Sequence, residues 1–171
     1  MIHGMAPQTP YTKDLGDREP LAAISESAAR CQRLMAQWTP QQFERPYAPG
    51  KWTARQILIH LAQSELAFGT RARMALSTPN YAAQAFNQDE WMAKEQQLAG
   101  KEALDALLAL MAMNRTFFDG LSPADLATTL SHPEYGTLTV DWILHQLAGH
   151  QIHHLAQIEQ IATRRPLRPA E

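Results

Sequence analysis

The chain has 171 residues, a formal net charge of −2 and 45% hydrophobic residues. This length suits one domain that can bury a core without a disulfide or a structural metal. The single cysteine, Cys31, excludes an internal disulfide and favours a reducing compartment. The near-neutral charge argues against nucleic-acid binding, because a phosphate-binding surface carries an excess of lysine and arginine.

The ends of the chain lack the apolar periodicity of its middle. Residues 1–17 contain Pro7 and Pro10 but no apolar segment of the kind found in signal peptides, so we predict an irregular arm. The longest apolar run, 106–113, is far shorter than the ~20 residues that cross a bilayer. We therefore expect a cytoplasmic protein without a membrane segment. Its single domain spans 18–165, and a tail follows at 166–171.

Two long helices are predicted in the first half of the chain, where apolar residues recur at steps of three and four. The first spans Pro20–Trp38, because proline suits the first helical turn and Pro40 stops the helix. The second follows a capping box made by Thr53 and Gln56 and reaches Leu76.

The second half adds two further long helices. After a loop and a short helix within 84–98, the spacing predicts a helix over Lys101–Phe118 and a mostly irregular stretch up to Gly136. A last helix, capped by Thr139, ends near Thr163. No stretch alternates with a period of two, so we expect no sheet. The predicted fold class is all-α, a four-helix bundle with a short extra helix or loop between helices two and three.

Histidine is the unusual feature of the composition, because four of the seven histidines fall within ten residues near the C-terminus. His150 and His154 are four residues apart, so they project from one face of the last predicted helix. They lie on its apolar stripe, where imidazole nitrogens need partners. His60 occupies the apolar stripe of the second long helix in the same way.

Three converging imidazoles would form a metal site. A catalytic metal centre has three protein ligands and an open fourth position, a count that His60, His150 and His154 would supply. Imidazole suits Zn, Ni, Cu or Fe, so the ligand type does not choose among these metals. His153 lies three residues after His150 and could replace one of the pair. The helical wheel favours it as a supporting residue or pocket wall. The alternative is that the histidines only form hydrogen bonds in the core.

Other polar and aromatic residues carry weaker signals. Cys31 lies on an apolar stripe and is expected to be a buried small hydrophobe. Arg71 and Arg73 could hold an anionic substrate group, but a solvated helix end is the preferred interpretation. Trp91 is the tryptophan that we place near a pocket, whereas Trp38, Trp52 and Trp142 fit core or staple positions. No function is assigned to the remaining histidines, His3, His132 and His145.

Three motifs in order resemble the DinB-like superfamily. The first motif resembles the second helix of that family and consists of GKWT at 50–53, ILIHL at 57–61, Ser64-Glu65 and Arg71-x-Arg73. HQIHHLAQI at 150–158 is similar to its last-helix motif, a His-x3-His followed three residues later by glutamine. NQDEW at 87–91 resembles a segment of the branch that contains bacillithiol transferases and proteins labelled metal-dependent hydrolases. The resemblance covers roughly residues 20–161.

The resemblance implies a metal-binding four-helix bundle that is often a homodimer. The three ligands of the family carry over onto His60, His150 and His154. Its members differ in activity, so a matching ligand set does not transfer a reaction. The small-molecule substrate and the identity of the metal stay open.

Two enzymatic functions and one non-catalytic function are consistent with this site. The leading hypothesis is a metal-dependent transferase that conjugates a low-molecular-weight thiol to an electrophile. The second is hydrolysis by a metal-activated water, which needs a nearby general base; the candidates are Glu65, Asp89, Glu90 and His153. The third is a bundle in which the metal serves stability or sensing.

Overall fold

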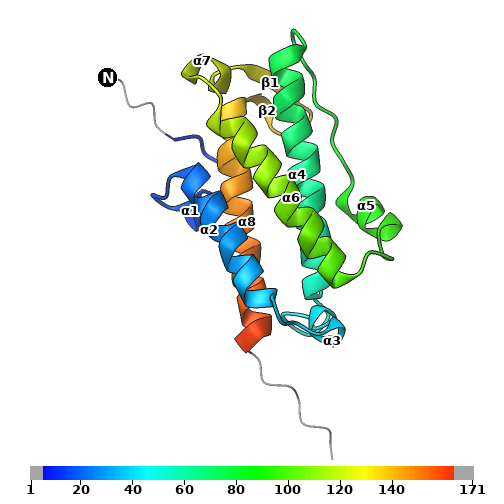
Figure 1. Ribbon diagram of the computed structural model, residues 1–171. Coiled ribbons are helices and arrows are strands. Elements are labelled where there is room, and N and C mark those ends of the chain that lie inside the picture. The colour runs from blue at the N-terminus through cyan, green and yellow to red at the C-terminus, as the bar shows by residue number, and fades with distance from the viewer. Residues whose placement is uncertain (1–5, 164–171) are drawn as a thin grey trace, which may run out of the picture.

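The computed structural model describes residues 6–163, so the predicted tail at 166–171 lies outside the described residues. Four long helices run side by side: α2 (Pro20–Met35), α4 (Ala54–Ser77), α6 (Gly100–Asp119) and α8 (Val140–Thr163) (Figure 1). The predicted four-helix bundle is therefore confirmed.

The helices α4 and α6 run in the same direction, which an alternating up-and-down bundle does not allow. A long crossover at 78–99 returns the chain to the end of the bundle where α4 began, and it carries the short helix α5 (Gln88–Lys94) (Figure 1). The helix α4 packs against both α6 and α8, and α2 packs against the same two helices. The face that α4 shares with α8 is where the histidines meet.

The predicted helix starts are present. Glu19 is the N-cap of α2 and precedes Pro20; its carboxylate accepts a hydrogen bond from the backbone amide of Ala22. Thr53 and Gln56 form the capping box of α4, with side chain to backbone distances of 2.9 and 3.3 Å. The α2 helix ends at Met35, three residues before the predicted end, and Pro40 instead opens the one-turn helix α3 (Pro40–Phe43).

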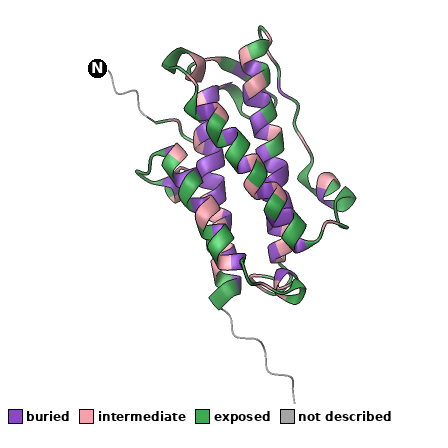
Figure 2. Ribbon diagram, in the orientation of Figure 1, coloured by how far each residue is buried: buried purple, intermediate pink, exposed green. Residues whose placement is uncertain are grey.

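The apolar stripes of the four helices meet in one core (Figure 2). Each long helix contributes fully buried side chains, among them Met35, Ile57, Leu107 and Ile143. Cys31 is buried among them, as expected of a small hydrophobe. Within the described residues, no helix is long and apolar enough to cross a membrane.

The stretch before α8 was expected to be irregular and to contain no sheet, and both expectations are wrong. It holds the one-turn helix α7 (Pro123–Leu126) and an antiparallel hairpin of β1 (Thr129–His132) and β2 (Gly136–Thr139). Each strand has only four residues and a single apolar side chain, Leu130 or Leu138, so neither shows an alternation of apolar and polar residues. The pairing of β1 with β2 is stabilised by the burial of Leu130 opposite Leu138.

The hairpin also holds part of the crossover. The amide of Ala83 donates to the carbonyl of Ser131 at 2.8 Å, and the amide of Ser131 donates to the carbonyl of Tyr81 at 3.0 Å. These two bonds attach residues 81–83 to β1. Ala85 and Phe86 follow shortly after and line the cavity described below.

The arm predicted to be irregular contains a helix, α1 (Thr12–Leu15), which packs against α8 (Figure 1). The indole N–H of Trp142 donates to the carbonyl of Gln8 at 2.8 Å, which attaches the preceding residues as well. The arm therefore belongs to the folded domain over its described part. Its single helical turn is too short to show a helical period in the sequence.

Candidate metal centre

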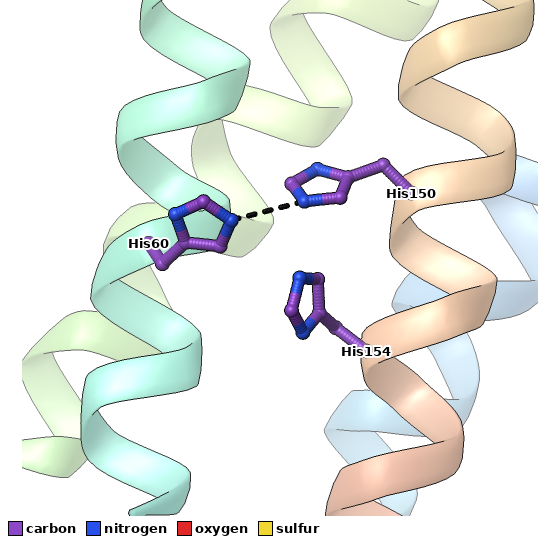
Figure 3. Close-up of side chains that lie close together, drawn as sticks. All are labelled: His60, His150 and His154. Carbon is purple, nitrogen blue, oxygen red and sulfur yellow. Dashed lines mark hydrogen bonds between the residues drawn. The ribbon is translucent and has the colours of Figure 1, made fainter. Parts of the chain in front are cut away.

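Three buried histidines converge between α4 and α8. His60 comes from α4, and His150 and His154 come from successive turns of α8 (Figure 3). Each of the three side chains projects from the buried face of its helix. The structure thus brings together the three residues that the apolar stripes singled out.

The ring nitrogens lie at the spacing of metal ligands. The Nε2 atoms of His60 and His150 are 3.0 Å apart, and one ligand nitrogen from each of the three rings lies within 4.8 Å of the others. Two nitrogens that each bind a metal at ~2.0–2.1 Å are themselves about 3 Å apart. The donor set therefore fits one divalent metal bound by three imidazoles, with a further position left for another ligand.

All three imidazoles are neutral at pH 7. Burial lowers the pKa of His60 to about 3 and that of His154 to about 4, and the proximity of His154 lowers the pKa of His60 further. Burial, and then the proximity of His154, His60 and His153, hold the pKa of His150 well below its usual value. A neutral imidazole keeps a lone pair, which is the form that binds metal.

Surrounding groups hold two of the rings in place. The Nδ1 atom of His154 donates to the side-chain carbonyl of Gln157 at 2.8 Å, which leaves Nε2 of that ring free to bind metal. The ring of Trp52 lies 4.9 Å from that of His60 and is stacked 6.4 Å from that of His154, measured between centroids. Trp52 was expected to serve only as a staple, and the sequence holds no sign of this contact.

His153 lies outside the convergent set. Its Nδ1 is 3.3 Å from a carboxylate oxygen of Asp14 in α1, and its Nε2 is 3.4 Å from the Gln157 amide. The ring packs edge-on to His154, with 5.1 Å between centroids. His153 is therefore placed as a neighbour of the site, in agreement with the helical wheel.

The N-terminal arm forms a wall of the site that the sequence did not predict. The ring of Tyr11 lies 4.8 Å from that of His150 and 5.3 Å from that of His153. The arm can come this close because residue 149 is a glycine. A Cβ atom at Gly149 would lie 2.7 Å from the carbonyl oxygen of Tyr11.

We expect Gly149→Ala to displace the arm from α8. The added methyl group overlaps the backbone of Tyr11, and such overpacking costs typically ~1–3 kcal/mol, partly offset by the better helix propensity of alanine. Faster tryptic cleavage after Lys13 would report the displacement. Gly120→Ala is the matched control, because its Cβ would meet backbone at 3.7 Å, an ordinary contact. Equal cleavage rates in wild type and both variants would contradict the predicted displacement.

The general-base candidate Glu65 is sequestered in the core. Its carboxylate accepts hydrogen bonds from the amides of Asn114, at 2.7 Å, and of Gln151. Burial raises the pKa of Glu65 to about 7, although both hydrogen bonds act in the opposite direction. Glu65 does not line the cavity beside the histidines, so it links α4 to α6 and α8 instead.

The candidates in the crossover point elsewhere. Asp89 and Glu90 are exposed in the first turn of α5, where their amides are capped by the side chain of Asn87. Trp91 lines a groove of about 460 Å³ between α4 and the crossover, together with Leu66. Neither Asp89 nor Trp91 lines the cavity beside the histidines.

A cavity of about 180 Å³ opens beside His60 and His150. The crossover and the hairpin complete its walls, with Phe86, His132, Glu134 and Tyr135 among the lining residues. Access to two of the three imidazoles from one cavity gives a small molecule a route to the fourth ligand position.

Two of the cavity residues correct the sequence-based predictions. Arg71 was interpreted as part of a solvated helix end, but only 5% of it is exposed and it lines the cavity. His132 received no function, and it too is buried in the cavity wall. The unpredicted strand β1 brings His132 to this position, so no local sequence signal could have found it.

Comparisons with known proteins agree with this architecture. The sequence profile of the DinB superfamily matches residues 23–158. A protein of Oceanobacillus iheyensis named "Putative metal-dependent hydrolase" is 29% identical over 126 residues, which are 73% of each chain. A protein of Bacillus mycoides with the same kind of name is 28% identical over 125 residues, 72% of each chain.

One solved structure with this fold is YfiT from Bacillus subtilis, described as a probable metal-dependent hydrolase with an unusual four-helix bundle topology. It superposes with a TM-score of 0.76 at 21% identity and covers 92% of this chain and 90% of its own. Because the profile match spans most of the bundle, this chain belongs to the DinB superfamily.

Proposed function

We propose that this protein binds a divalent metal on His60, His150 and His154 and transfers a low-molecular-weight thiol to a small electrophile. The observation that carries the proposal is the convergence of three neutral imidazoles at the edge of a cavity. A divalent metal held there supplies Lewis acidity, which lowers the pKa of a thiol or of a water molecule.

The surroundings of the three imidazoles favour a thiol over water as nucleophile. Glu134 is the single carboxylate among the described cavity-lining residues, and it lies on the exposed turn of the hairpin. A thiol starts from a pKa of ~8.5 and needs little help to ionise, whereas water starts from ~15.7. A mycothiol-dependent maleylpyruvate isomerase shares the fold, with a TM-score of 0.69 at 15% identity over 88% of this chain and 63% of its own.

The chain's own residues would orient the reactants. Gln157 holds the ring of His154, and Trp52 covers His60 and His154 with an apolar surface that excludes water. Tyr11 closes the cavity next to His150. We place the reaction in the cytoplasm, because small thiols stay reduced there. The one cysteine, Cys31, is buried, so the sulfur would come from a small molecule.

Hydrolysis is the second candidate, and the names of the relatives favour it. Glu134 would be the general base, because it lines the cavity while Glu65, Asp89 and His153 do not. Glu134→Gln would then lower the rate of ester hydrolysis by roughly 10²–10⁴-fold. Thiol transfer would keep most of its rate in this variant.

The test uses protein loaded with Zn, Ni or Fe(II) and 1-chloro-2,4-dinitrobenzene as electrophile. The thiol sulfur bonds to the ring carbon, chloride leaves with the electron pair of the broken bond, and the thiol proton passes to solvent. We expect a metal-dependent conjugation rate with at least one of glutathione, cysteine, coenzyme A, bacillithiol and mycothiol, read by absorbance. The His60→Ala variant should show only the uncatalysed rate.

The same preparations are offered a p-nitrophenyl ester without thiol. Metal-dependent ester cleavage with no conjugation would replace thiol transfer by hydrolysis. If no metal supports either conjugation or ester cleavage, both enzymatic proposals fail, and the remaining interpretation is a bundle in which the metal serves stability or sensing.

A further inference from the structure

A buried cation that forms no salt bridge within the described residues lines the cavity beside the histidines, with Glu134 as the carboxylate on the same wall. Arg71 is 95% buried, and it forms no ion pair with any residue that the structure describes. A buried charge is costly unless another charge or several hydrogen bonds compensate it. Its only hydrogen bond within the described chain goes to the carbonyl oxygen of Gln84. Most of its N–H donors are therefore left for a ligand.

The guanidinium is held in one orientation. Its central carbon lies 4.9 Å from the ring centroid of Phe68 and 5.7 Å from that of Phe86. The bond to Gln84 comes from the crossover segment that the hairpin holds in place. A fixed, planar guanidinium presents two parallel N–H groups, which match the two oxygens of a carboxylate.

The hairpin adds a second donor and one opposing charge. The Nδ1 atom of His132 accepts from the amide of Glu134 at 3.2 Å, so the neutral ring carries its proton on Nε2 as a donor. Both His132 and Arg71 line the same cavity. Glu134 lies on that wall too, and its negative charge limits how much anionic charge the cavity can accept. One arginine and one neutral histidine suit a monoanion.

We propose that Arg71 and His132 bind the carboxylate of a small monoanionic substrate and hold its reactive carbon beside His60 and His150. The inference rests on the proposed function for the identity of the reactive end, but the anion subsite itself stands on Arg71. The cavity volume of about 180 Å³ restricts the substrate to a compact molecule.

The test compares two electrophiles of the same shape that differ in charge. We measure calorimetrically, on metal-loaded protein without thiol, the binding of 4-chloro-3-nitrobenzoate and of its neutral amide. Wild-type protein should bind the carboxylate at least about tenfold more tightly than the amide, as expected for charge-assisted hydrogen bonds to arginine. Equal binding of the two compounds, or no carboxylate binding, overturns the subsite.

Variants assign the preference to Arg71. Arg71→Met should abolish the preference for the carboxylate, whereas Glu134→Gln should strengthen carboxylate binding. The matched control is Arg73→Met on the same helix: Arg73 bonds to Gly69 and Asn114 and does not line the cavity, so this variant should keep the preference. A preference unchanged by Arg71→Met shows that the carboxylate binds elsewhere, for instance at the metal.

Two further measurements keep the outcome decisive. If Arg71→Met fails to fold, as seen by its melting curve, Arg71→Lys takes its place. Lysine keeps the charge but loses the paired donors, so the preference should fall by at least about threefold. An Arg71-dependent preference in a protein that conjugates no thiol would sink the proposed reaction and leave the subsite intact. Conjugation without any preference for the carboxylate would overturn the subsite and leave the proposed reaction intact.

Discussion

The His150→Ala variant is expected to lose its metal. His150 is buried beside His60 and His154, and its Nε2 lies 3.0 Å from that of His60. Losing one of three protein ligands should weaken binding by more than the ~10–100-fold that loss of a supporting group costs. Elemental analysis after gel filtration should therefore find close to one metal per wild-type chain and almost none in the variant.

A thermal measurement adds a second readout. A metal that binds only the folded state stabilises it by about 4 kcal/mol at a concentration ~1,000 times its dissociation constant. Adding Zn should raise the melting temperature of the wild type but not that of His150→Ala. The control is His145→Ala on the same helix, because His145 pairs with Asp141 and is not among the convergent histidines. Equal metal content in wild type and His150→Ala would falsify the assignment.

The Glu65→Gln substitution is expected to change how stability depends on pH. Burial raises the pKa of Glu65 from 4.5 to about 7, so the folded state binds its proton more tightly than the unfolded state does. Between these two pKa values the folded state holds more protons, and the free energy of unfolding falls as the pH rises. Below pH ~4.5 Glu65 is neutral in both states and costs the folded state nothing. Above pH ~7 it is ionised in both states, and the full cost of burying its charge destabilises the folded state.

Glutamine carries no charge at any pH, so it removes this dependence. The difference in unfolding free energy, variant minus wild type, should rise by about 2 kcal/mol between pH ~5.5 and ~8. The three convergent histidines act in the opposite direction, because their lowered pKa values make the free energy of unfolding fall as the pH drops below the usual pKa of histidine. Their contribution is common to both proteins and cancels in the difference.

Urea denaturation at several pH values on metal-free protein measures this difference. Glu26→Gln is the control, because Glu26 is exposed on α2 and should give a flat difference. A flat difference for Glu65→Gln would show that the carboxylate titrates normally in the fold. In Glu65→Gln, Asn114 can keep donating to the side-chain oxygen, while Gln151, whose own side-chain oxygen has no partner, can rotate to accept from the new amide group, so we expect the variant to fold.

The long helices and the burial of the three histidines could be predicted because their signals are local. Capping residues such as Thr53 satisfy the first amides of a helix, and the 3.6-residue period places His60 on the buried stripe of α4. The same period puts His150 and His154 on one face of α8. A polar residue on an apolar stripe needs a partner, and this requirement led from the sequence to the candidate ligands.

Contacts between distant segments could not be predicted in this way. The cap of Tyr11 over His150 depends on close approach of the arm at Gly149. The role of Arg71 depends on a crossover and a hairpin that close over one end of α4. Glu65 looked like a general base in the sequence, yet two amides from other helices hold it in the core.

The sequence by itself determined a four-helix bundle, the approximate ends of its long helices and the three histidines that share its interior. Periodicity and capping carry these features, and both act within a few residues along the chain. Only the tertiary structure decided which surfaces surround those histidines. The walls of the cavity come from the arm, the crossover and the hairpin, whose places are set by packing against helices far away in the sequence.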